Sequence, residues 1–151
     1  MNKRRSFITG IKTISLSLRE IDFLQKYKPW GVILFSRNIK SLVQIKKLTD
    51  EIKKIFKDKN YPILIDQEGG RVNRFKNFFI SDHLTGEFFG KLYIKDKKKF
   101  NLQYKMFINK TCNLLKLAGI NINTVPVLDL KVHGASNIIG DRSFSNNPKL
   151  V

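Results

Sequence analysis

Short apolar runs alternate with longer amphipathic stretches along the chain, and this alternation limits the possible folds more than any other feature. The apolar runs, rich in β-branched residues, lie at 7–14, 31–35, 62–65 and 120–125. The stretches with helical periodicity lie between them, at 17–27, 41–55 and 97–118. Such a series predicts the α/β class, with parallel strands in a sheet and helices packed outside it.

Capping residues predict where the helices begin and end. Ser17 and Glu20 have the spacing of a capping box, in which each side chain accepts a hydrogen bond from the other's backbone amide. Ser41 and Gln44 repeat that spacing. Gly119 follows the third helical stretch, at the position where a left-handed residue commonly ends a helix.

The end of the chain has the signal of a further helix. Asn147 and Pro148 suit the N-cap and the first helical position, but only three residues follow Pro148. The periodicity fits either a doubly wound sheet or a barrel, and a complete barrel of eight units needs about 250 residues. We therefore expect an interrupted polypeptide, with 1–151 as one partial domain.

The chain is strongly basic, with a formal net charge of +17. A basic surface can indicate a nucleic acid or an acidic membrane as partner. Here the charge comes mostly from lysines spread over the predicted helices, whereas arginine, the usual reader of phosphates and bases, is scarce. A composition bias explains this pattern better, so we expect no nucleic-acid or membrane partner.

The sequence also favours a cytoplasmic location. No apolar stretch reaches the roughly 18 residues of a membrane helix. The basic Met1–Arg5 is followed by a segment too short and too polar for a secretory signal. Cys112 is the single cysteine, so no internal disulfide can form, and a reducing cytoplasm is the simplest compartment. Cys112 lies among apolar residues and is expected to be a small core side chain.

Polar residues gather where the predicted strands end, in the segments 36–38, 66–75 and 126–129. Ligands of parallel α/β folds bind at these carboxyl ends. Asp66 would place a carboxylate at this rim, and Arg71 and Arg74 would supply planar groups with several donors.

The glycines of the second polar segment widen its possible roles. Gly69 and Gly70 would allow positive φ angles and a close approach of the backbone to a ligand. The segment fits a sugar or an anion, but an Asp–Arg ion pair that only fixes the loop fits it as well. It lacks the glycine and lysine spacing of a phosphate-binding loop.

Four segments resemble family 3 glycoside hydrolases of the β-N-acetylglucosaminidase type, in order and in spacing. They are GVILFSRNI at 31–39, DQEGGRVNRF at 66–75, PVLD at 126–129 and IGDRSFS at 139–145. The resemblance covers nearly the whole chain and is poorest at 78–104. It implies the first half of a TIM-like (β/α)8 barrel, truncated at its C-terminus.

The resemblance also implies an activity. Members of this type hydrolyse terminal, non-reducing β-linked N-acetylglucosamine, and a retaining mechanism with a glycosyl-enzyme intermediate is expected. Bacterial members recycle peptidoglycan fragments in the cytoplasm, so the implied partner is a saccharide of the N-acetylglucosaminyl-anhydro-muropeptide type. No metal or organic cofactor is implied.

Carried over by motif, the implied substrate-binding residues are Asp66, Arg74 and Arg142. Asp66 would accept hydrogen bonds from sugar hydroxyls, and Arg142 would donate to a hydroxyl nearby. Arg74 would hold either the sugar or the Asp66 loop. Arg71 has no clear counterpart and is treated as a support residue. Asp129 is expected to cap or brace the end of the fourth strand.

The groups that would perform the hydrolysis are not among these motifs. The family takes its histidine acid/base and its aspartate nucleophile from later segments, which the 151 residues do not contain. Glu68 is assigned no catalytic role by the resemblance. His83 and His133 are the only histidines and are expected to be surface or loop residues. The chain is therefore expected to be inactive alone.

Two alternative functions fit part of this pattern. A half barrel could bind a sugar without catalysis, although its first and fourth strands would be unpaired edges, which promote aggregation. A β-glucosidase-like member of the same family would share several motifs, but the segments at 66–72 and 139–145 favour the N-acetylglucosaminidase branch.

Overall fold

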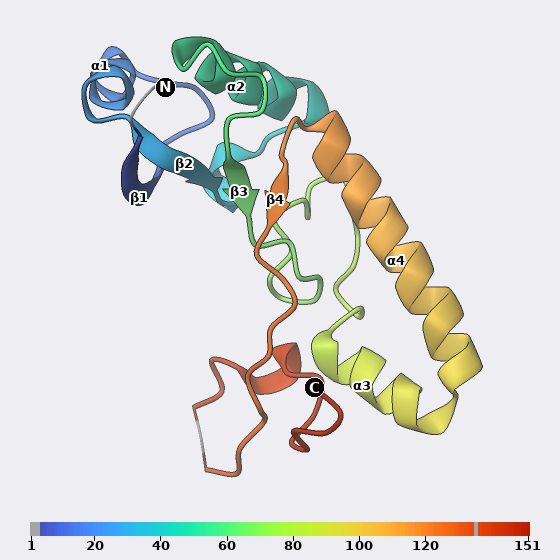
Figure 1. The fold of residues 1–151 in the computed structure, drawn as a ribbon. Helices are drawn as coiled ribbons and strands as arrows, with labels where there is room; N and C mark the ends of the chain where they lie inside the picture. The colour runs from blue at the N-terminus through green and yellow to red at the C-terminus, as the bar shows by residue number, and fades with distance from the viewer. Residues whose placement is uncertain (1–3, 135) are drawn as a thin grey trace. The chain divides into compact units, whose positions relative to one another are not determined.

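The structure is a computed structural model that describes residues 4–134 and 136–151. The chain divides into two compact units. The first unit consists of Met1–Asp66 and Asn113–Thr124, and the second consists of Gln67–Cys112 and Val125–Val151. Figure 1 shows the elements of both units in chain order.

The first unit contains a parallel sheet. Its strands are β1 (Arg5–Gly10), β2 (Pro29–Leu34), β3 (Ile63–Ile65) and β4 (Ile122–Asn123). They lie side by side in the order β1-β2-β3-β4, and every pairing is parallel (Figure 1). Doubly wound sheets reverse their strand order at a switch point, whereas barrels keep sequential order. The predicted parallel α/β fold is confirmed, and the order favours the barrel type.

The outer strands are shorter than predicted. β1 ends at Gly10, although the apolar run continues to Ile14. The carbonyl oxygens of Ile11 and Thr13 instead accept hydrogen bonds from Asn38 Nδ2, at 3.1 and 2.8 Å. A buried amide side chain thus replaces the strand pairing at this point.

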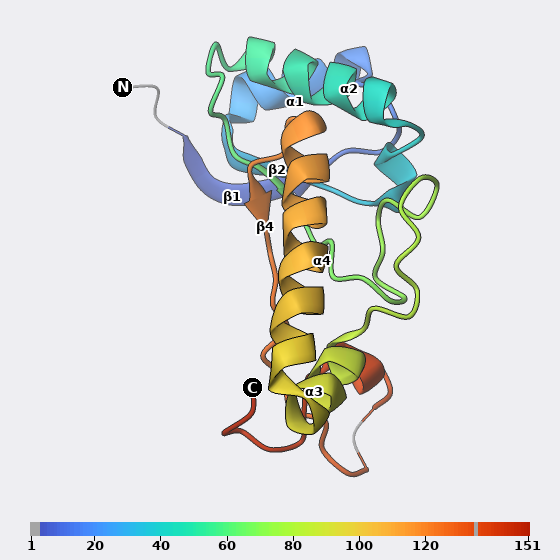
Figure 2. The same ribbon diagram turned by 90° about the vertical axis from the view of Figure 1, so that its right-hand side faces the viewer.

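Two helices follow the first two strands. They are α1 (Leu18–Tyr27) and α2 (Leu42–Ile55), and both lie on the same side of the sheet (Figure 2). Ser17 and Glu20 form the predicted capping box, with Ser17 N donating to Glu20 Oε2 at 2.9 Å. Lys28, with a φ of 48°, ends α1 before Pro29.

The second predicted capping box is only half formed. Ser41 Oγ accepts from Gln44 N at 3.2 Å, as predicted. Gln44 Oε1, however, accepts from Lys40 N at 2.8 Å, and Gln44 Nε2 donates to Ile14 O at 2.6 Å. The glutamine therefore ties the helix start to the loop that follows β1 instead of closing the box.

The core of the first unit is mostly aliphatic. Several side chains of α2, β2 and β3 are at most 1% exposed, and Tyr61 adds a fully buried aromatic ring. The aliphatic members on these elements are Val32, Leu34, Ile45, Leu48, Ile52, Ile63 and Ile65. Strands buried on both faces are typical of parallel sheets covered by helices.

The predicted third helix is preceded by a helix that the sequence did not reveal. α3 (Gly86–Lys95) begins after Thr85, whose Oγ1 accepts from Phe88 N at 3.1 Å. α4 (Lys97–Leu117) follows directly, and Asp96 Oδ1 accepts from Lys99 N at 2.9 Å. Gly119 has a φ of +75°, which confirms it as the stop after α4.

The core of the second unit is aromatic. The ring of Phe89 lies 4.8 Å from Tyr104 and 5.4 Å from Phe107, measured between centroids. On α4, Thr111 is buried, whereas Cys112 is exposed. The prediction of a core cysteine was wrong, because Cys112 lies one position away from the inward face.

Among the described residues, no helix combines the length and the apolar character that crossing a membrane requires.

Candidate functional site

Asp66 follows the last residue of β3 directly. The three residues of β3 are buried, and Asp66 is half-buried at the end of the first unit. A short apolar strand thus ends in a carboxylate, as predicted. The other predicted site residues, Arg74 and Arg142, belong to the second unit.

The loop after Asp66 is held by two buried amide side chains. Gln67 Nε2 donates to Asn73 Oδ1 at 3.1 Å, and Asn73 Nδ2 donates to Phe79 O at 2.5 Å. Gln67 Oε1 in turn accepts from the backbone N–H of Arg74 at 2.7 Å. The backbone of Arg74 is therefore fixed from within the loop.

Gly69 and Gly70 adopt the predicted left-handed backbone, with φ of 95° and 53°. A Cβ on Gly69 would lie 2.3 Å from Leu84 O, and one on Gly70 would lie 2.6 Å from Thr85 Cγ2. Among the described residues, the close approach that these glycines permit is to the segment before α3.

Glu68 and Arg142 form a two-pronged ion pair. Arg142 Nε donates to Glu68 Oε2 at 2.8 Å, and Arg142 Nη2 donates to Glu68 Oε1 at 2.7 Å. The side chains are only 11% exposed for Glu68 and 24% for Arg142. Parallel N–H···O bonds of this kind fix the plane of a guanidinium as well as its position.

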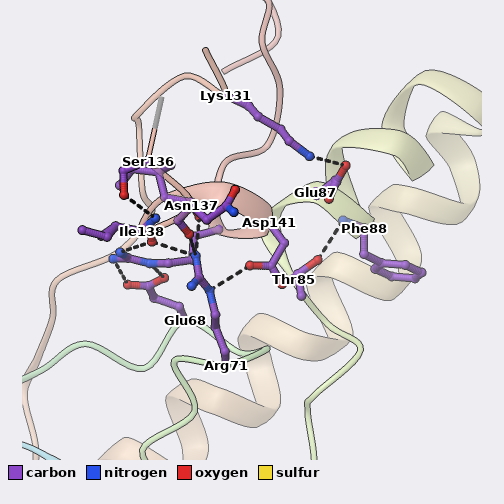
Figure 3. A network of polar contacts seen from close by, with 12 residues as sticks. Glu68, Arg71, Thr85, Glu87, Phe88, Lys131, Ser136, Asn137, Ile138 and Asp141 are labelled. Atoms are coloured by element: carbon purple, nitrogen blue, oxygen red, sulfur yellow. Dashed lines mark hydrogen bonds and ion pairs between the residues drawn. The ribbon is translucent and has the colours of Figure 1, made fainter. Parts of the chain in front are cut away.

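Arg71 holds the segment that precedes Arg142 (Figure 3). Its Nε lies 2.9 Å from Asp141 Oδ1, and its Nη2 donates to Asn137 O, Ile138 O and Ile139 O. The predicted support role of Arg71 is confirmed for this loop.

The residues after Arg142 lie directly on the backbone of α3. A Cβ on Gly86 would lie 2.1 Å from Arg142 O, and one on Gly90 would lie 1.8 Å from Phe144 O. Two glycines one helical turn apart therefore let residues 142–144 pack against α3 without intervening side chains.

A cavity of about 610 Å3 lies beside these loops in the second unit. Lys91 and Lys131 both bind Glu87 Oε1 at its edge, at 2.9 and 3.0 Å. These hydrogen bonds lower the pKa of Glu87, against a smaller opposing effect of burial. His133 also lines the cavity.

Three further residues of the sequence prediction, two histidines and an aspartate, are exposed. His83 and His133 are exposed, as expected. Asp129 is exposed and lies six residues after the end of β4, so it does not cap that strand directly. Thr124 continues the pairing there, with its N–H donating to Ile65 O at 2.9 Å.

The sequence prediction missed several supporting residues. Gln67, Asn73 and Asp141 were not singled out, and Glu68 was given no function. The sequence did contain a sign of their role, because amide and carboxylate side chains stand among the glycines and arginines of these loops. Only the fold shows which of these groups meet.

The residue types in these loops are ones that suit a polyhydroxylated ligand. Arginine forks donate to hydroxyl oxygens, and a carboxylate accepts from hydroxyl hydrogens. In the part of the chain that the structure describes, there is no group of three or more histidines, cysteines or acidic residues placed to hold a metal ion.

The fold and these loops define a parallel α/β protein of the barrel type, with polar residues after its strands. The model of the glycosyl hydrolase family 3 N-terminal domain matches residues 11–151. The chain therefore belongs to glycoside hydrolase family 3.

Relatives of known name agree with this assignment. A β-hexosaminidase of Xanthomonas campestris pv. campestris is 33% identical over 95% of the chain. A β-hexosaminidase of Alkalilimnicola ehrlichii is 37% identical over 94% of it. The chain spans about 42% of the first relative and 40% of the second.

Solved structures give the same picture. NagZ from Neisseria gonorrhoeae, in complex with N-trifluoroacetyl-D-glucosamine, matches with a TM-score of 0.85 and 31% identity. The match covers 97% of this chain and 43% of that protein. It confirms that the chain has the fold of the N-terminal part of such an enzyme.

Proposed function

We propose that the chain supplies sugar-binding residues of a β-N-acetylhexosaminidase. The observation that carries this proposal is the close match, over 97% of the chain, to a NagZ solved with an N-acylated glucosamine. The relatives named β-hexosaminidase support the same reaction class. The reaction is the removal of a terminal, non-reducing β-linked N-acetylglucosamine.

Three residues bind the sugar in this proposal. Asp66 accepts hydrogen bonds from ring hydroxyls, and Arg142 donates to a hydroxyl oxygen. Glu68 orients Arg142 for this contact, because the two hydrogen bonds of the pair fix the plane of the guanidinium. Arg74 is placed by the bond between its backbone N–H and Gln67, and it holds the sugar or the loop.

The 151 residues hydrolyse nothing on their own in this proposal. Retaining hydrolysis needs a nucleophile and an acid/base placed on either side of the scissile bond. The site residues supply hydrogen bonds and charge, and Glu68 is engaged by Arg142. The acid/base and the nucleophile therefore come from segments outside these residues.

We extend the proposal to the substrate and the compartment. The substrate is an N-acetylglucosaminyl-anhydro-muropeptide released from peptidoglycan, and the reaction takes place in the cytoplasm. Support comes from the family motifs and from the single cysteine, which requires no oxidising compartment.

A chimaera tests the proposed reaction. The 151 residues would replace the matching segment of the Neisseria gonorrhoeae NagZ, with which they align over 97% of their length. We expect the chimaera to release the chromophore from a chromogenic β-N-acetylglucosaminide, and the 151 residues alone to release none. A chimaera with Asp66→Ala should lose the activity.

Other outcomes would contradict parts of the proposal. Turnover by the 151 residues alone would show that a catalytic group is present among them. A folded chimaera that cleaves a β-glucoside but no N-acetylglucosaminide would replace the substrate assignment. Cleavage of chitobiose with no cleavage of a muropeptide would remove the link to peptidoglycan.

A further inference from the structure

One nitrogen of Arg71 binds three successive backbone carbonyls. Nη2 donates to Asn137 O and Ile138 O at 2.7 Å, and to Ile139 O at 2.9 Å. Successive carbonyl groups of an extended strand point to opposite sides, so three of them could not reach one nitrogen from such a strand. The backbone before Arg142 is therefore curled around this guanidinium.

A second contact fixes the orientation of the same side chain. Arg71 Nε lies 2.9 Å from Asp141 Oδ1, so the guanidinium spans the curled segment from Asn137 to Asp141. A lysine has one nitrogen and could not occupy both positions together. The carbonyl contacts and the Asp141 contact together therefore require an arginine.

Gly140 makes room for this arrangement. It has a φ of +47°, and a Cβ built on it would lie 3.1 Å from Arg71 Nη2. The positive φ of Gly140 favours a glycine, and a Cβ there would be in tight contact with the guanidinium.

Arg71 and Arg142 share one acceptor. Ile138 O accepts from Arg71 Nη2 at 2.7 Å and from Arg142 Nη1 at 3.3 Å. The backbone N–H of Arg142 also donates to Ile139 O at 2.9 Å, and Arg71 binds that same oxygen. If Arg71 moved, the two shared carbonyl groups would move with it, and both the backbone and the side chain of Arg142 would change position.

We infer that Arg71 is a positioning residue for sugar binding, and that it acts through Arg142 by fixing the loop of residues 137–141. This inference rests on the proposed function, since it assumes that Arg142 contacts the sugar. Arg71 itself does not touch the sugar. Its contacts in the second unit are with the loop, which it holds in the shape that presents Arg142.

A double-mutant cycle in the NagZ chimaera tests this inference by titration of N-acetylglucosamine. Arg71→Ala should weaken binding about tenfold, the ratio that corresponds to one lost hydrogen bond with a charged group. Arg142→Lys should also weaken it. In the Arg142→Lys background, Arg71→Ala should cause little further loss, because its effect passes through Arg142. Lys95→Ala, which removes an exposed charge of α3, is the matched control and should bind normally.

Two results would overturn the inference. An equal loss from Arg71→Ala in both backgrounds would mean that Arg71 acts on binding independently of Arg142. Unchanged binding in Arg71→Ala, with Arg142→Lys impaired, would mean that the loop keeps its shape without Arg71.

Hydrogen exchange separates this inference from the proposed function. The backbone amide of Arg142 should exchange faster in Arg71→Ala than in the unaltered protein, while amides of α2 should not change. If the NagZ chimaera with unaltered residues 1–151 binds no N-acetylglucosamine, the proposed function fails, and this exchange still decides whether Arg71 orders the loop. Unchanged exchange at Arg142 would show that it does not.

Discussion

Charged residues at the candidate site bind one another before any ligand is present. Glu68 holds Arg142, and Asp141 holds Arg71. The sequence prediction considered an acid–arginine pair that fixes a loop as an alternative to sugar binding. The structure shows acid–arginine pairs in these loops, Glu68 with Arg142 and Asp141 with Arg71. Such pairs are compatible with loop fixation and with sugar binding alike.

Replacing Glu68 should destabilise the protein. Glu68→Gln removes the charge and one acceptor from a pair in which both side chains are mostly buried, so we expect a loss of about 1–3 kcal/mol. Urea unfolding would measure this loss. Glu51→Gln on α2 is a matched control, and an equal effect in both variants would contradict the role of the Glu68–Arg142 pair.

The pH dependence of stability should reflect Glu87. Hydrogen bonds from Lys91 and Lys131 lower the pKa of this carboxyl below its usual value of 4.5. The charged carboxylate therefore stabilises the folded state above about pH 4.5, and this contribution is lost as the pH falls through the lowered pKa. The stability difference between the unaltered protein and Glu87→Gln should be larger at pH 7 than at pH 3.5. A difference that is independent of pH would contradict this.

At the scale of elements, local capping predicted α1 and α2 well, but α3 was missed. Ser17 and Ser41 mark helix starts that depend on neighbouring residues alone. α3 contains Gly86 and Gly90, which lower helix propensity by about 1 kcal/mol each relative to alanine. These glycines are explained by the contact with residues 142–144, which lie more than fifty positions later in the sequence. No local pattern could reveal that contact.

The same contact gives a prediction for α3. Gly90→Ala would raise helix propensity but place a Cβ 1.8 Å from Phe144 O. The cost of this clash should exceed the gain in helix propensity, because a backbone oxygen cannot move as easily as a side chain. The free energy of unfolding should therefore fall by about 1–3 kcal/mol. Thermal unfolding would measure it, with Lys95→Ala in the same helix as the control. A stabilised Gly90→Ala variant would mean that residues 142–144 do not lie on α3.

A capping prediction applies to the first unit. Ser17→Ala removes the oxygen that accepts from Glu20 N and should cost about 1 kcal/mol. Ser15→Ala, two residues earlier and outside the capping box, is the control. Equal unfolding free energies for the two variants would show that the box contributes nothing to α1.

At the scale of the whole molecule, the fold class and the position of Asp66 were predictable because they follow from patterns along the chain. Apolar strands separated by amphipathic helices indicate a parallel sheet, and β3 ends where its apolar run ends. The support of the two arginines was not predictable, because Glu68 meets Arg142 across 74 positions and Arg71 meets the carbonyl of Asn137 across 66. Those contacts depend on tertiary structure.

The most direct measurement of the central claim is a titration of N-acetylglucosamine into the NagZ chimaera, followed by calorimetry. We predict saturable binding to the chimaera with unaltered residues 1–151, its loss in Asp66→Ala and in Arg142→Ala, and its retention in Lys95→Ala. Undiminished affinity in a correctly folded Asp66→Ala variant would contradict the claim that the carboxylate after β3 grips the sugar.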